Sequence, residues 1–210
     1  MTKVVVCYGD SNTWGADPAG TGRFAPDVRW TGVLQAELGS GYKIIEEGLN
    51  GRTTNIEDTI EEDRNGRRQL PPTIESHRPF DLMIIMLGTN DLKQRNNRSA
   101  ADIAQSASKL AELARKSLAG PDGGNPKVLL MAPPATVRAG HGLDQLFEGS
   151  VEKSKRFPEQ YAFYAAAAGV EFLDAGSIVV SSPVDGIHLD PDEHAKLGRA
   201  VAAEVRRIIG

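Results

Sequence analysis

The sequence contains one cysteine, few aromatic residues and no long hydrophobic run. Because Cys7 is the only cysteine, no disulfide can form within the chain, and its place inside an apolar run predicts a buried, inert thiol. No segment approaches the roughly 18 apolar residues that a membrane helix needs, and no signal-type stretch precedes the first apolar run. We therefore expect a cytoplasmic protein, in which the glycosylation sequon at Asn97 has no consequence.

Positive charge is not in excess, because 24 Lys and Arg residues stand against 28 Asp and Glu residues. The basic residues form no long run, so neither a nucleic acid nor another polyanion is expected as a partner. The four histidines are scattered without metal-ligand spacing, so we expect no metal and no other cofactor. No glycine-rich phosphate loop follows the first apolar run, which argues against a nucleotide-binding module. The length predicts one domain over residues 1–210.

Apolar runs and segments of helical period alternate along the chain. Strands are predicted for the run that breaks at Gly9 and for residues 42–48, 80–88, 127–133 and 170–176. A parallel sheet covered by helices on both faces accounts for strands that are apolar throughout. The fold class predicted is α/β, a three-layer α/β/α sandwich with a five-stranded parallel sheet in the flavodoxin-like order 2-1-3-4-5.

Capping residues predict where several helices begin and end. Ser99 caps a helix with an apolar face that ends at Gly120; the face comprises Ile103, Ala107, Leu110, Ala114 and Leu118. Asp190 caps the last helix, with Pro191 at its first position and Glu193 completing a capping box. Pro158 must start or kink a helix. Two long irregular stretches, 16–30 and 133–147, are expected at the carboxyl edge of the sheet, where they would shape a binding site.

Gly9-Asp10-Ser11 follows directly after the first strand, at the edge of an open α/β sheet where ligands bind. A helix that begins just after Ser11 would direct free backbone N–H groups at whatever the serine hydroxyl touches. This position suits a nucleophile whose product is an oxyanion. The alternative is an ordinary turn and helix N-cap, because all three residue types favour such places.

A serine nucleophile needs a base, and His188 is the best placed of the four histidines. Asp185 precedes it by three residues in a tight loop, so the carboxylate can fix the imidazole tautomer and leave Nε2 free to take a proton. Alternatively, the two residues only brace the loop. We expect His77 to be solvated or to cap a helix and His194 to be exposed on the last helix, and His141 could line a pocket rim.

Two further strand ends carry candidate oxyanion donors. Asn90, in Gly88-Thr89-Asn90-Asp91, could direct a side-chain N–H at a developing oxyanion. Gly51, just beyond the second strand, could offer an uncrowded backbone N–H to the same oxygen. Each has a plain structural alternative, a helix cap for Asn90 and a turn for Gly51.

Together, these segments resemble, in order, the four blocks of the SGNH (GDSL) hydrolase family. The four segments are Gly9-Asp10-Ser11, Gly51, Gly88-Thr89-Asn90-Asp91 and Asp185-Gly186-Ile187-His188. The segments GDSNTWG, RFAPDVRWTGVL, IEEGLNGRTTNIED, IIMLGTNDLK, FLDAG and VDGIHL resemble its bacterial arylesterase/acyltransferase branch, which includes esterases capable of perhydrolysis. GDSNT lacks the final glycine of the GxSxG elbow, which argues against the α/β-hydrolase fold. Gly51 is a departure, since a close relative has alanine there, and the loop after the fourth strand is unlike that of the relatives.

The resemblance implies Ser11 as the nucleophile, His188 as its base and Asp185 as the orienting acid, with Ser11 N–H, Gly51 N–H and Asn90 as the oxyanion hole. We expect the substrate pocket to include Asp10, Trp14, Thr89, Phe147 and Ile187, although Trp14 and Phe147 could equally belong to a core or an interface. Members of the branch commonly form homo-oligomers, up to octamers, so a homo-oligomer is expected.

The predicted activity is that of a serine esterase that acts on short-chain, acetyl-like carboxylic and aryl esters through an acyl-enzyme. Water, an alcohol or peroxide would then take the acyl group in a ping-pong reaction. The alternatives are a carbohydrate acetyl esterase or an acyl-CoA thioesterase with the same triad. A non-enzymatic binding protein of the same fold is a further alternative, but its expected mark, a broken triad, is absent from the sequence.

Overall fold

The computed structural model of the protein describes residues 2–138 and 143–210. Five strands form one parallel sheet, in the order β2-β1-β3-β4-β5. The strands are β1 (Lys3–Gly9), β2 (Tyr42–Gly48), β3 (Leu82–Met86), β4 (Lys127–Ala132) and β5 (Glu171–Asp174). The predicted strand order is confirmed, and each strand lies within two residues of its predicted bounds.

The apolar strands are buried on both faces of the sheet. In β1, Val5 and Cys7 pack into one core while Val6 and Tyr8 pack into the other, and all four side chains are buried. Alternate residues of a strand point to opposite faces, so a strand between two cores is apolar throughout. Burial raises the pKa of the Cys7 thiol well above its ordinary value, which keeps the thiol protonated and unreactive.

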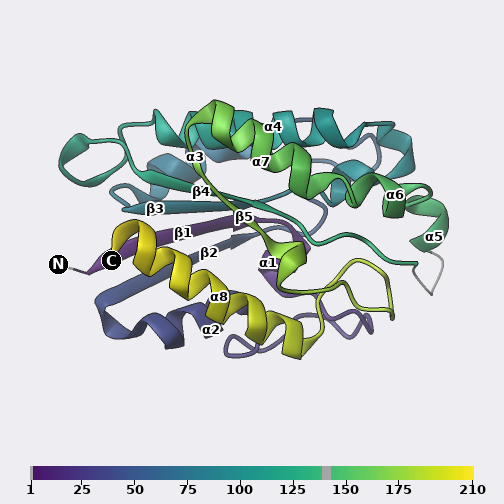
Figure 1. The fold of residues 1–210 in the computed structure, drawn as a ribbon, viewed down its shortest axis with the longest axis horizontal. Coiled ribbons are helices and arrows are strands. Elements are labelled where there is room, and N and C mark those ends of the chain that lie inside the picture. Colours follow the sequence, from purple (N-terminus) through teal and green to yellow (C-terminus); the bar gives the residue numbers. More distant parts are fainter. Residues whose placement is uncertain (1, 139–142) are drawn as a thin grey trace.

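Helices cover both faces, which gives the three layers visible in Figure 1. On one face lie α3 (Gly66–His77), α4 (Ala100–Arg115) and α7 (Phe157–Ala168), and on the other lie α2 (Trp30–Leu38) and α8 (Pro191–Ile209). Shorter helices occupy the connections: α1 (Ser11–Trp14), α5 (Leu143–Leu146), α6 (Ser150–Ser154) and the 3-10 helices η2 (Asn90–Leu92) and η3 (Gln94–Asn96), with further 3-10 turns at Gly39–Gly41, Pro121–Gly123 and Ala175–Ser177.

Helix α4 ends earlier than the sequence predicted, at Arg115 instead of Gly120. The hydroxyl of Ser117 donates to the carbonyl of Ala114 (2.7 Å), a local bond that competes with continuation of the helix. Leu118 then adopts a left-handed conformation with φ of 56° and is 63% exposed. Leu118 therefore does not extend the apolar face of the helix.

The caps of α4 and α8 differ. Ser99 and Asp102 form a capping box at the start of α4. Asp190 precedes α8 without a side-chain capping bond, and Glu193 instead accepts a hydrogen bond from the backbone N–H of Val180 (3.0 Å). The predicted capping box of α8 is therefore wrong, because the preceding loop uses the carboxylate. Pro158 lies in the first turn of α7, which it starts without a kink.

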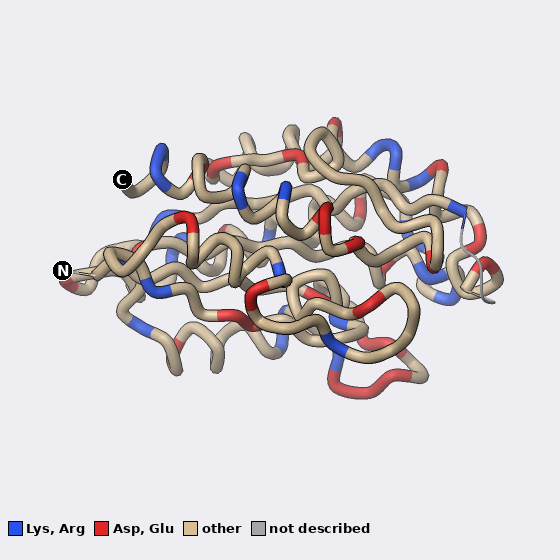
Figure 2. The backbone as a smooth tube through the Cα atoms, turned by 90° about the horizontal axis from the view of Figure 1, so that it is seen from below, with Lys and Arg blue, Asp and Glu red and all other residues tan. Residues whose placement is uncertain are grey.

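The chain termini and the carboxyl ends of the strands lie at opposite ends of the molecule. Both termini lie at the left of Figure 1, whereas the carboxyl ends of the strands point right, toward α1, α5 and the long connections. Figure 2 shows basic and acidic residues interspersed over most of the described chain, apart from one loop in which acidic residues predominate. None of the helices in the described part of the chain is long and apolar enough to span a bilayer.

Candidate active site

Ser11 begins α1 immediately beyond the carboxyl end of β1. Asp10 caps this short helix by accepting a hydrogen bond from the backbone N–H of Asn12 (3.0 Å). The turn needs glycine at position 9, because a Cβ there would lie 2.0 Å from Oγ1 of Thr13. The result is a nearly buried serine, 7% exposed, held at a fixed place on the sheet edge.

Ser11, His188 and Asp185 form a continuous hydrogen-bonded relay. Nε2 of His188 lies 2.8 Å from Oγ of Ser11, although 177 positions separate the two residues in the sequence. Nδ1 of His188 is hydrogen-bonded to Oδ2 of Asp185. Oδ1 of Asp185 accepts hydrogen bonds from the backbone N–H groups of Ile187 and His188, both at 3.0 Å. This arrangement fixes the ring and suits Nε2 to accept the serine proton.

The electrostatics of Asp185 favour its ionised form. Burial opposes ionisation, but the hydrogen bond from His188, the charge of that ring and the two backbone N–H groups outweigh burial and lower the pKa of Asp185. The loop can close because Gly186 adopts φ of 80°, in the left-handed region that glycine tolerates. An ionised Asp185 is therefore available to stabilise a positive charge on His188.

Gly51 and Asn90 lie on the same cleft as Ser11. Asn90 begins η2, and its Nδ2 donates a hydrogen bond to the carbonyl of Arg52 (3.2 Å), the residue that follows Gly51. Gly51 adopts φ of 78°, so it is both a turn residue and a cleft-lining one. Asn90 does not cap η2 with its side chain, since its amide is directed at the neighbouring loop.

Arg52 braces this region, and its role was not predicted from the sequence. Its Nη1 donates to the carbonyl of Gly9 (2.7 Å), and its guanidinium lies over the ring of Tyr8, 4.1 Å from the centroid. A second tie comes from Asp91, a buried side chain whose Oδ2 accepts a hydrogen bond from the backbone N–H of Thr54 (2.9 Å). Burial raises the pKa of Asp91 to about 6.

The cleft that contains Ser11 and His188 has a volume of about 220 Å³ and two unlike walls. The apolar wall comprises Leu143, Leu146, Phe147 and Ile187, and the polar wall comprises Asn50, Glu61, Asn90 and Lys93; Ala16 and Gly51 also line the cleft. The small volume suits a short acyl group.

The predicted pocket residues divide into two groups. Phe147 and Ile187 line the cleft, as expected. Asp10, Trp14 and Thr89 do not line it: Asp10 and Thr89 are buried, and the ring of Trp14 packs under the guanidinium of Arg23, 4.9 Å away. Burial raises the pKa of Asp10 to about 6. Asp10 instead caps α1, Trp14 contacts Arg23, and Thr89 is buried.

Several residues that line the cleft were not predicted from the sequence. Leu143 and Leu146 belong to the irregular stretch that was expected to shape a site, so their apolar character was a usable signal. Glu61 and Lys93 gave no such signal, because they come from different loops and meet only in the folded chain.

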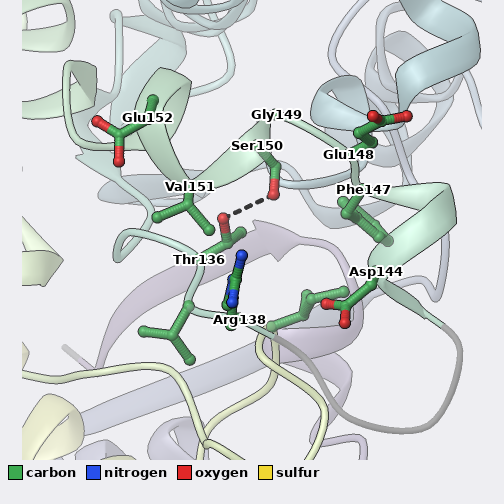
Figure 3. A pocket seen from close by; sticks show the side chains of 11 residues that line it. Thr136, Arg138, Asp144, Phe147, Glu148, Gly149, Ser150, Val151 and Glu152 are labelled. Atoms are coloured by element: carbon green, nitrogen blue, oxygen red, sulfur yellow. Dashed lines mark hydrogen bonds between the residues drawn. The ribbon is translucent and has the colours of Figure 1, made fainter.

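A second, larger cavity of about 720 Å³ adjoins the cleft and shares Phe147 and Ile187 with it. Figure 3 shows the side chains that line this cavity. Thr136 and Ser150 contribute hydroxyl groups that are hydrogen-bonded to each other (2.9 Å). The remaining polar lining comprises Arg138, Asp144, Glu148 and Glu152. Acidic residues therefore outnumber the single basic one in this lining, while Phe147 and Ile187 belong to the apolar wall that the cavity shares with the cleft.

Of the other three histidines, the two that the structure describes make hydrogen bonds away from Ser11. His194 was expected to be exposed, but it is fully buried, and its Nδ1 accepts a hydrogen bond from the backbone N–H of Trp30 (3.2 Å) at the start of α2. His77 lies at the end of α3, where its Nε2 is 2.6 Å from Oε1 of Glu47. His141 lies outside the described residues. Within residues 2–138 and 143–210, no group of three His, Cys, Asp or Glu side chains is placed to hold a metal ion.

Comparisons with known proteins agree on one family. The sequence profile of the GDSL-like Lipase/Acylhydrolase family matches residues 7–196. A solved aryl esterase from M. smegmatis is 41% identical, with a TM-score of 0.94 over 99% of this chain and 100% of that chain. A carbohydrate acetylesterase from Sinorhizobium meliloti is 39% identical, with a TM-score of 0.94 and the same coverage of each chain. A search of curated protein sequences found no match.

Proposed function

Because the chain belongs to the GDSL-like lipase/acylhydrolase family and is an esterase-type serine hydrolase, we propose that it cleaves short-chain carboxylic and aryl esters through an acyl-enzyme on Ser11. The observation that carries the proposal is the relay from Asp185 through His188 to Ser11, which opens into a cleft of about 220 Å³. The family match covers residues 7–196, which supports one hydrolase domain over residues 1–210.

The proposed reaction has two stages. Oγ of Ser11 attacks the ester carbonyl while Nε2 of His188 takes its proton, and the C–O bond to the alcohol then breaks as His188 returns that proton to the leaving oxygen. The backbone N–H groups of Ser11 and Gly51 and the side-chain amide of Asn90 stabilise the tetrahedral oxyanion. Water, activated by His188, releases the acid and restores the free serine.

Acyl transfer is proposed as a second outcome of the same intermediate. An alcohol or hydrogen peroxide can replace water as the group that attacks the acyl-enzyme. The apolar wall of Leu143, Leu146 and Phe147 supports this outcome, because a partly dry cleft lowers the local share of water.

A carbohydrate acetyl ester is the second candidate substrate class, and the adjoining cavity favours it. The hydroxyls of Thr136 and Ser150 and the carboxylates of Glu148 and Glu152 suit a hydroxyl-bearing alcohol. The solved structure named a carbohydrate acetylesterase supports the same assignment. The acidic lining disfavours the phosphates of an acyl-CoA, so a thioesterase is the weaker alternative.

The test is release of p-nitrophenol from p-nitrophenyl acetate and p-nitrophenyl octanoate by wild type and by Ser11→Ala. We expect the acetate to be preferred and the substitution to lower kcat by about 10³-fold or more. A variant that retains wild-type turnover would remove Ser11 as the nucleophile. A preference for octanoate would instead overturn only the short acyl site.

The homo-oligomer and the cytoplasmic location expected from the sequence stay predictions. Light scattering of the purified protein decides the first and fractionation of the source cells decides the second.

A further inference from the structure

Four charged side chains join the loop that carries Gly51 to the segment that carries Asn90. The cluster consists of Asp58 and Glu61 from the first loop and Lys93 and Arg95 from the second segment. The side chain of Asp58 is fully buried and that of Lys93 is 3% exposed. Two negative and two positive charges thus balance each other at the polar wall of the cleft.

Asp58 is the centre of this cluster. It accepts hydrogen bonds from Nε and Nη2 of Arg95 (3.0 and 2.6 Å), from Nζ of Lys93 (3.2 Å), and from the backbone N–H groups of Ile60 (2.9 Å) and Glu61 (3.1 Å). Burial alone would raise the pKa of Asp58, but the bond from Arg95, the backbone N–H groups and Lys93 hold it well below its usual range. The carboxylate is therefore ionised at neutral pH.

The cluster reaches both candidate oxyanion donors. Glu61, which is 2.5 Å from Nζ of Lys93, lies directly against Gly51, because a Cβ on Gly51 would be 2.4 Å from its Oε2. On the other side, the backbone N–H of Lys93 donates to the carbonyl of Asn90 (3.3 Å). The side-chain amide of Asn90 in turn bonds the carbonyl of Arg52.

We propose that Asp58 is a positioning residue that clamps residues 49–65 against residues 90–96, so that the N–H of Gly51 and the amide of Asn90 converge on one oxygen. The inference rests on the proposed acyl-enzyme function, in which these groups stabilise an oxyanion. Such donors are effective only when they are held in place before the charge develops. A misplacement of about 1 Å can cost 10²-fold in rate, so a clamp outside the reacting atoms controls kcat.

The first test compares Asp58→Asn with Glu57→Gln. Asparagine keeps the shape of the side chain but removes the charge that Lys93 and Arg95 share. Glu57 is the matched control, because it lies on the same loop and pairs with Asn65 (3.0 Å) and Arg68 (3.1 Å) instead of with the 90–96 segment. With p-nitrophenyl acetate we expect Asp58→Asn to lower kcat by about 10- to 100-fold with KM within about twofold, and Glu57→Gln to change neither.

Phenylboronic acid provides a readout that a general loss of stability would not give, because it forms a tetrahedral adduct on an active serine. Its inhibition constant should rise in Asp58→Asn by about the same factor as kcat falls, since both depend on the oxyanion donors. An unchanged inhibition constant alongside a lower kcat would overturn the inference.

A double-mutant cycle with Asn90→Ala asks whether Asp58 acts through the donors. If it does, the cost of Asp58→Asn should shrink once the amide of Asn90 is gone, because only the N–H of Gly51 is then left for the cluster to position. Losses that multiply fully would show that the two residues act independently and would overturn the proposal.

Arg95→Gln decides the matter if Asp58→Asn does not fold, because Arg95 is 20% exposed and its replacement leaves Asp58 paired with Lys93. We expect a smaller loss of kcat in the same direction, and an unchanged kcat would overturn the proposal. The Ser11→Ala result separates the two levels of inference. If Ser11→Ala stays active, the proposed acyl-enzyme is ruled out. If Ser11→Ala is inactive but the Asp58 and Arg95 variants keep wild-type kcat, only the proposed role of Asp58 is ruled out.

Discussion

Residue 51 must satisfy both a backbone requirement and a space requirement. Its φ of 78° lies in the left-handed region, and the carboxylate of Glu61 occupies the place where a side chain would begin. Either requirement alone would favour glycine. Together they imply that a substitution here disturbs both the local backbone and the polar wall of the cleft.

Gly51→Ala should therefore lower kcat for p-nitrophenyl acetate by about tenfold, because Glu61 must move away from the donor that it flanks. It should also cost about 1 kcal/mol of unfolding free energy through the left-handed backbone. Gly20→Ala is the control, since Gly20 has φ of 75° but no atom lies within 4 Å of the place that its Cβ would take. The control should lose similar stability in urea unfolding and keep its kcat, and equal losses of kcat in both variants would contradict the argument.

The residues of the candidate site differ in how far the sequence could predict their meeting. Ser11, Gly51 and Asn90 each follow a strand, so the parallel topology alone brings them to one edge of the sheet. Asp185 and His188 are close in sequence, which made their pairing predictable. Arg52 was not predictable, because a long side chain that crosses back to the carbonyl of Gly9 leaves no periodic or spacing signal.

At the scale of elements, similar sequence signals produced one capping box and not the other. Ser99 caps α4 as expected and also exchanges capping-box bonds with Asp102, a pairing that was not predicted. At α8, the side chain of Glu193 instead accepts a hydrogen bond from the backbone N–H of Val180. The boundary signals are local, whereas their outcome depends on which distant backbone group lies within reach.

The difference is measurable as stability. Ser99→Ala should lower the free energy of unfolding by about 1 kcal/mol, because it removes an acceptor that bonds the backbone N–H of Asp102 (3.1 Å). Asp190→Ala should cost only a few tenths of a kcal/mol, because its side chain makes no capping bond. Urea unfolding of both variants checks this order. Equal costs would mean that Asp190 contributes in a way its static contacts do not indicate.

At the scale of the whole molecule, the alternation of apolar runs with helical segments was enough to predict the layers and the strand order. Alternation does not report which polar residues become buried, and this is where the prediction failed. His194 was expected to be exposed because it lies in the first turn of a helix, yet α2, α8 and Phe24 enclose it. The molecule thus contains a buried imidazole together with the buried carboxylates of Asp10 and Asp91.

These groups make opposite contributions to stability in the same pH range. Burial raises the pKa of Asp10 and of Asp91 to about 6, so each binds more protons when folded, and its contribution to stability is lost as pH rises from about 4 to 6. Burial lowers the pKa of His194 from 6.5 to about 4, so it binds fewer protons when folded, and its contribution is lost as pH falls through the same range. Each of these pKa shifts corresponds to about 3 kcal/mol of unfolding free energy, so the opposing contributions partly cancel.

Substitutions that remove one group at a time should separate these contributions. In His194→Asn, the amide oxygen can still accept the bond from Trp30, but the titration is gone. Its stability deficit relative to wild type should therefore shrink by about 2 kcal/mol between pH 7 and pH 4.5. In Asp91→Asn the sign reverses: the stability of the variant relative to wild type should be about 2 kcal/mol more favourable at pH 7 than at pH 4.5. Urea unfolding at pH 4.5, 5.5 and 7 measures both differences, and a difference that stays constant with pH would mean that the substituted group does not change its protonation on unfolding.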